Sequence, residues 1–198
     1  MFYCRLLYDM STLSANFVST FPQSEDLLTS SYADDFTISC SNSNVDQMAE
    51  SLSAHSPIIE EWAGERALAI SAPKSTITLF TPQFAQSNIH PQVTLSDSVL
   101  PLERNPCILG VTFDPHFKFN AHVKSLVTRA LPRINILKAL TGTNWGQQKE
   151  TILITYKSLI RSLFMYAAPI WFPNTSPSLV QKLQTIQNSV LCIATGSV

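Results

Sequence analysis

The spacing of the hydrophobic residues changes near Pro115, and this change constrains the fold more than any other feature of the chain. Before it, short apolar runs such as residues 27–32 and 36–40 have the length and alternation of strands. After it, apolar residues recur three and four positions apart, as on one face of a helix. The sequence therefore predicts an α+β protein: antiparallel strands with packed helices, followed by an all-helical region.

Local signals predict the individual elements. A helix should begin at Ser43, with Asp46 three residues later as in a capping box, and Pro57 should kink or end it near Ser56. Leu6, Leu7, Met10 and Leu13 have helical spacing. Further strands are expected at residues 67–70 and 76–80, paired as a hairpin, and at residues 93–95, 99–102 and 108–113.

Three helices are expected after Pro115. The first carries a buried stripe with Pro132 inside it, and the second ends before Pro169. Ser176 as N-cap, Pro177 and Gly196 frame the third. The first stripe consists of Val123, Leu126, Val127, Ala130, Ile134 and Leu137; the second of Ile152, Tyr156, Leu159, Ile160 and Leu163; the third of Leu179, Leu183, Ile186 and Val190.

The charges are divided as unevenly as the apolar residues. Residues 1–114 hold four basic and thirteen acidic residues, whereas residues 115–198 hold nine basic residues and only Glu150 as an acid. We therefore predict two parts with this boundary. The basic part indicates a polyanion partner, because clustered cations neutralise phosphates and release counterions. A solvated face that docks on the acidic half is an equal alternative.

The cysteines and apolar runs exclude some classes of protein. Four cysteines lie far apart, so we expect reduced thiols, with Cys40 and Cys107 buried, and no zinc site or disulfide scaffold. No apolar run approaches the roughly 20 residues of a membrane span, so no membrane partner is expected. The sequence does not predict a cellular compartment.

Asp34 and Asp35 lie between two predicted strands. Two carboxylates about 5 Å apart repel each other by roughly 3 kcal/mol at an effective dielectric constant of 20, so a neighbouring divalent cation would stabilise them. An Asp-Asp pair is also common in ordinary turns. The flanking residues decide between these interpretations.

Tyr32-Ala33-Asp34-Asp35 resembles the Tyr-x-Asp-Asp catalytic hairpin of reverse transcriptases. Residues 72–80 resemble the lysine-bearing motif that follows it, and residues 108–114 resemble the primer-grip strand. Residues 137–145 and 166–171 resemble the helical region of LINE-type, non-LTR retrotransposon enzymes. Nearly the whole chain is covered, with the five segments in the family's order.

The resemblance implies RNA-directed DNA synthesis by two-metal nucleotidyl transfer. Asp34 and Asp35 would be catalytic ligands of two Mg²⁺ ions, and Lys74 would lie near the leaving pyrophosphate, although a surface turn lysine is an equal alternative. Tyr32 and Ala33 would lie beneath the primer end. The backbone of Leu109 and Gly110 would approach the same end, unless Gly110 only marks a bulge.

Residues 1–114 would then be a partial palm, and residues 115–198 a thumb or connection region. The partners implied are an RNA template, a DNA primer and a deoxynucleoside triphosphate. Arg129 with Arg133, and Lys157 with Arg161, are each four residues apart and share a helix face, so we favour duplex contact over a solvated face. The nucleic-acid contacts expected are Lys124, Arg129, Arg133, Lys157 and Arg161.

The chain also departs from the family pattern. The earlier palm aspartate, the Pro-Gln-Gly-type segment and the fingers are not visible before Tyr32, and Asp9 does not replace the missing ligand. We therefore expect a C-terminal palm and thumb that requires the missing N-terminal segment and is inactive, or nearly so, alone. The alternatives are a non-catalytic nucleic-acid-binding remnant of a retroelement and a degenerate fragment without function.

Overall fold

The computed structural model describes residues 2–7, 27–32, 35–65, 70–71, 74–141 and 148–195, and for residues 2–7, 31 and 35 it describes the backbone alone. The chain forms two compact units, Met1–Pro106 and Cys107–Val198. Asp114, the boundary suggested by charge, lies within the second unit.

A four-stranded antiparallel sheet organises the first unit. Its strands are β1 (Phe2–Leu7), β2 (Leu27–Tyr32), β3 (Asp35–Cys40) and β4 (Thr76–Leu79), in the spatial order β2-β3-β1-β4. The helical expectation for the first segment is wrong at residues 2–7, because these residues form ladders with both β3 and β4. A short apolar run does not by itself distinguish a strand from a helix, and pairing decides here.

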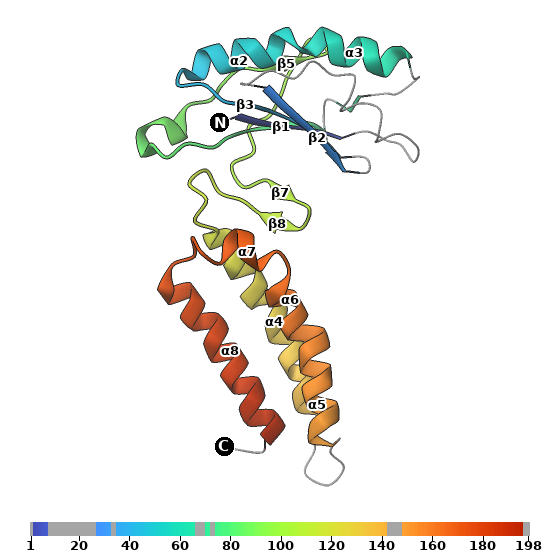
Figure 1. Cartoon of the computed structure of the whole chain (residues 1–198), viewed down its shortest axis with the longest axis vertical. Coiled ribbons are helices and arrows are strands. Elements are labelled where there is room, and N and C mark those ends of the chain that lie inside the picture. Colours follow the sequence, from blue (N-terminus) through green and yellow to red (C-terminus); the bar gives the residue numbers. More distant parts are fainter. Residues whose placement is uncertain are drawn as a thin grey trace. The chain divides into compact units, whose positions relative to one another are not determined.

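Two helices lie along one face of this sheet (Figure 1). They are α2 (Val45–Ala54) and α3 (Ser56–Glu65), and the break between them falls at His55, as Pro57 predicted. The cap of α2 is Asn44 and not Ser43, because the Asn44 side chain accepts a hydrogen bond from the Asp46 amide at 2.8 Å. Val45, Met48 and Leu52 bury the inner face of α2.

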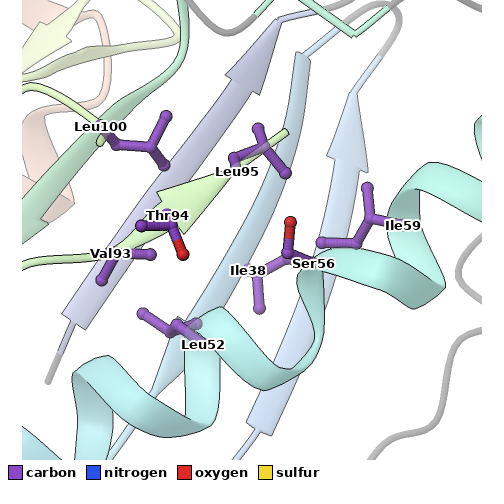
Figure 2. Close-up of a pocket in the computed structure, with 8 residues that line it drawn as sticks. All are labelled: Ile38, Leu52, Ser56, Ile59, Val93, Thr94, Leu95 and Leu100. Carbon is purple, nitrogen blue, oxygen red and sulfur yellow. The ribbon is translucent and has the colours of Figure 1, made fainter. Parts of the chain in front are cut away.

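The remainder of the first unit closes the core. After η2 (Phe84–Asn88), β5 (Thr94–Leu95) and β6 (Ser98–Val99) form a small hairpin, where short strands were expected at residues 93–95 and 99–102. β4 pairs with β1 along one edge. The hairpin expected between residues 67–70 and 76–80 stays a prediction, because residues 67–69 lie outside the described residues. Figure 2 shows Ile38, Leu52, Ile59 and Leu95 around a cavity of about 10 Å³. This volume suits about one water molecule, so the cavity is a packing gap and not a substrate site.

The second unit begins with a short hairpin whose two strands are two residues long each. Its strands are β7 (Cys107–Ile108) and β8 (Val111–Thr112), so the single strand expected at residues 108–113 is wrong. Leu109 and Gly110 form the turn with φ values of +46° and +80°. Positive φ at both central residues is characteristic of the hairpin turn that matches strand twist.

Helices make up the rest of the second unit. α4 (Asn120–Leu140) contains Pro132; α5 (Lys149–Tyr156), the π-helical turn η3 (Lys157–Arg161) and α6 (Ser162–Met165) follow one another; and α7 (Ala168–Trp171) precedes α8 (Pro177–Thr195). α8 packs against α4 and α5.

The three stripes expected from the sequence form the core of this unit. Val123, Ala130, Leu137, Ile160 and Val190 are fully buried. Val127, Leu159 and Leu163 are partly buried at the edge of the core. None of the helices among the described residues is both long enough and apolar enough to cross a bilayer.

Candidate catalytic hairpin and nucleic-acid interface

The candidate catalytic hairpin consists of β2 and β3, paired from Leu27 opposite Cys40 to Tyr32 opposite Asp35. Successive side chains of β2 point to opposite faces of the sheet, so Leu27 and Thr29 are buried and Leu28 is exposed. β3 is held from both sides, because β1 pairs along its other edge. The hairpin is therefore part of the unit's core and not an isolated ribbon.

The end of this hairpin contains the predicted metal site. Tyr32 is 65% exposed, and the backbone of Asp35 pairs with both Tyr32 and Leu7. Ala33 and Asp34, and the side chain of Asp35, lie outside the described residues, so their roles stay predictions. No group of three or more metal-ligating side chains occurs among the residues that the structure describes.

Lys74 lies just before β4, on a turn in which its amide donates to the Ser71 carbonyl at 3.0 Å. Arg5 of β1 is opposite Thr37 on one side and Thr76 on the other. Two interstrand spacings, about 10 Å, therefore separate the backbones of β3 and β4 at this level. The register brings the exposed Lys74 to the same end of the sheet as Asp35.

The predicted primer-grip residues Leu109 and Gly110 form the β7–β8 turn of the second unit. The Tyr166 hydroxyl donates a hydrogen bond to the Leu109 carbonyl at 2.6 Å. The carbonyl of Tyr166 in turn accepts from Trp171 Nε1 at 3.0 Å. Tyr166 lies in a family-like segment of the sequence, but no local pattern there indicates this contact, which joins residues 57 positions apart.

The predicted phosphate contacts all lie in the second unit, which holds nine lysines and arginines against Asp114 and Glu150, a net formal charge of +7. Lys124 and Arg129 are exposed on α4, and Lys157 and Arg161 are exposed on η3. Arg133 differs, because it is half-buried and its Nη1 donates to the Leu159 carbonyl. It therefore has a structural role that its spacing did not predict.

His122 is a buried member of this unit that sequence spacing did not distinguish. Its Nδ1 accepts a hydrogen bond from the Thr112 amide at 3.2 Å, and its ring centroid lies 5.7 Å from that of Trp171. Nε2 is buried and has no hydrogen-bond partner among the described residues. Burial, and then the positive charge of Arg129, lower the pKa of His122 from its usual value.

The cysteines agree with the expectations only in part. Cys40 is buried as expected, whereas Cys107 is exposed. Cys107 and its partner Thr112 lie on one face of this short ladder, whereas the buried Val111 and its partner Ile108 lie on the other. Cys40 is a free thiol.

Comparison with known proteins gives one similar protein. The chain is 21% identical, over 164 residues and 83% of its length, to a probable RNA-directed DNA polymerase from transposon BS of Drosophila melanogaster. It spans 18% of the length of that relative. No family model and no solved structure matches the chain. The similarity supports a reverse-transcriptase-like relationship at the level of the family and does not define domain boundaries.

Proposed function

We propose that this chain is the palm hairpin and helical thumb of an RNA-directed DNA polymerase of a non-LTR retrotransposon. The observation that carries the proposal is the register of the β2–β3 hairpin. Tyr32 opposes Asp35, so the Tyr-x-Asp-Asp segment coincides with the hairpin's end, as in the family it resembles. The similarity to a transposon polymerase over 83% of the chain supports the same conclusion.

The proposed chemistry divides between two carboxylates and a lysine. Asp34 and Asp35 would hold Mg²⁺, which supplies charge stabilisation for the attacking 3′-hydroxyl and the leaving phosphate oxygens. Lys74 would neutralise charge on the leaving pyrophosphate, because it approaches the same end of the sheet. An RNA template, a DNA primer and a deoxynucleoside triphosphate would be the partners.

The second unit would bind the template–primer duplex through its phosphates. Its net formal charge of +7 and the exposed positions of Lys124, Arg129, Lys157 and Arg161 support this role. Sequence readout is not required for such binding, because phosphate contacts position a protein without selecting bases.

The experiment measures metal-dependent binding of a deoxynucleoside triphosphate to the chain on an RNA–DNA primer–template. We expect binding to need Mg²⁺ and to weaken at least tenfold in Asp34→Asn, since one carboxylate ligand is lost. Asp97→Asn is the matched control, because Asp97 is an acidic residue in the two-residue turn between β5 and β6 of the first unit. Primer extension by the chain alone should be absent or nearly so, and robust extension abolished by Asp34→Asn would overturn the expected inactivity.

A non-catalytic nucleic-acid-binding remnant is the second candidate. The observation that favours it is that the cations and the hairpin belong to different units. In that case duplex binding would persist, unchanged by EDTA and by Asp34→Asn, and no metal-dependent nucleotide binding would be detected. Absence of both duplex and nucleotide binding would contradict both candidates.

A further inference from the structure

The β7–β8 turn is held by a side chain from a distant part of the second unit. Tyr166 Oη donates to the Leu109 carbonyl at 2.6 Å, and Tyr166 Cε1 lies 3.4 Å from the position that a Cβ would take on Gly110. We propose that Tyr166 is a positioning residue that keeps this turn in the shape that receives the 3′-terminal nucleotide of the primer. This inference rests on the proposed function.

The turn needs support from outside the hairpin. Leu109 has a φ of +46°, a left-handed conformation that costs free energy for any residue with a Cβ. Asparagine, aspartate or glycine is the usual choice at this position of a two-residue turn, because their left-handed penalty is small. The hydrogen bond from Tyr166 offsets part of the cost for leucine, so it selects this backbone shape over alternatives.

The tyrosine is itself anchored in the core. Trp171, which is 1% exposed, donates from Nε1 to the Tyr166 carbonyl at 3.0 Å. Ala167, the next residue, has a φ of +50° and turns the chain from α6 into α7. The backbone of Tyr166 is therefore held by a buried side chain and does not belong to a freely moving loop.

The contact is also accessible to a ligand. Tyr166 is 54% exposed and Leu109 is 46% exposed. The ladder of a two-residue hairpin joins the flanking residues, which leaves the amides of the two turn residues available for other partners. Backbone amides contact phosphate and sugar oxygens, and an aromatic face stacks on a base. These groups together suit the terminal nucleotide of a strand.

A primer–template with 2-aminopurine as the primer's 3′-terminal base tests the inference, and a second duplex carries the probe at an internal position. In the wild-type chain, binding should change the emission of the terminal probe. Tyr166→Phe should lower the occupancy of the terminal site about threefold to tenfold, and Tyr166→Leu should lower it further. The dissociation constant of the duplex and the emission of the internal probe should stay within about twofold of their wild-type values, because phosphate contacts elsewhere supply the affinity.

Tyr156→Phe is the matched control. It removes a hydroxyl group from a buried tyrosine of the same unit and should leave both probes unchanged. Leu109→Gly in the Tyr166→Phe background removes the left-handed penalty and should restore the terminal signal. That rescue distinguishes positioning of the turn from a general loss of structure, which glycine would not repair.

The result that overturns the inference is a terminal signal equal to wild type in both Tyr166 variants, with duplex binding preserved. Loss of the terminal and internal signals together, without rescue by Leu109→Gly, would show a merely structural tyrosine and would also overturn it. If the wild-type chain binds no duplex at all, the proposed function itself fails, and this outcome is separate from the other two.

Discussion

Arg133 on α4 donates a hydrogen bond from Nη1 to the backbone carbonyl of Leu159 in η3. In this π-helical turn the Ser162 amide bonds to the Lys157 carbonyl, five residues earlier. Such a turn disturbs the regular i to i−4 ladder and leaves carbonyl groups in need of other donors. Arg133 therefore holds the segment that carries Lys157 and Arg161.

Replacing Arg133 with methionine should destabilise the second unit by about 1–3 kcal/mol, because the half-buried Leu159 loses a donor to its carbonyl. Denaturant unfolding followed by tryptophan fluorescence measures this change. Lys124→Met is the control on the same helix, and since Lys124 is exposed, its effect should stay within about 0.5 kcal/mol. Equal effects of the two substitutions would contradict the role given to Arg133.

Duplex binding should depend strongly on salt. If four cations of the second unit contact phosphates, log K should fall against log salt concentration with a slope of about −3. The double variant Lys157→Gln, Arg161→Gln should make this slope less steep by about 2, because two phosphate contacts are removed. Fluorescence anisotropy between about 50 and 200 mM salt measures the slope. A slope near zero in the wild-type chain would contradict the assignment of the second unit as a thumb that binds the duplex.

The stability of the second unit should fall as the pH drops below the ordinary histidine pKa of about 6.5. Burial and Arg129 lower the pKa of His122 in the folded state, so below that pH the unfolded chain binds a proton that the folded chain does not. This one group changes the unfolding free energy by at most about 1.4 kcal/mol per pH unit. Unfolding free energies measured between pH 5 and 8 test this expectation.

His122→Asn keeps an acceptor for the Thr112 amide and should flatten this pH dependence, while the space left beside Trp171 lowers stability at every pH. His90→Asn changes an exposed histidine of the first unit and should leave the profile unchanged. A profile in His122→Asn as steep as in the wild type would show that another group is responsible.

Glu60 should stabilise the first unit less in acid. Burial raises its pKa, but hydrogen bonds from the Ser56 side chain and from the amide and side chain of Ser96 outweigh burial, so the pKa lies below its usual value. The contribution is therefore present above about pH 4.5 and is lost as the pH falls through the folded-state pKa.

Glu60→Gln should lower stability at pH 7 by about 1 kcal/mol and reduce the loss between pH 5 and 3, because glutamine accepts more weakly than a carboxylate. Thermal unfolding across this range measures both effects. Glu61→Gln changes the adjacent exposed residue and is the control. An effect of Glu61→Gln as large as that of Glu60→Gln would exclude the Ser96 contact as the cause.

Sequence patterns predicted the parts of the fold that depend on near neighbours. Pro57 placed the break between α2 and α3, and helical spacing placed the buried residues of α4 and α8. The β2–β3 hairpin followed from alternation on either side of the acidic pair. The cap at Asn44 was missed, because Ser43 and Asn44 are both good capping residues and only the backbone geometry selects between them.

The candidate site was predictable where a motif carried it and not where distant residues meet. The Tyr-x-Asp-Asp segment indicated the hairpin's end, but nothing near Leu109 in the sequence indicates that Tyr166 holds its carbonyl. The spacing of Arg129 and Arg133 suggested equivalent cations, whereas the structure turns Arg133 toward Leu159. Spacing along one helix contains no information about the neighbouring helix.

By itself, the sequence determined the strand-rich and helix-rich parts, the buried faces of the main helices and the acidic end of one hairpin, because these follow from the periodicity of side chains along a single element. Only the tertiary structure decided that β1 lies between β3 and β4, that Arg133 supports a π-helical turn and that Tyr166 holds a strained turn. Each of these depends on groups far apart in the chain, whose pairing is set by packing of the whole unit and not by local preference.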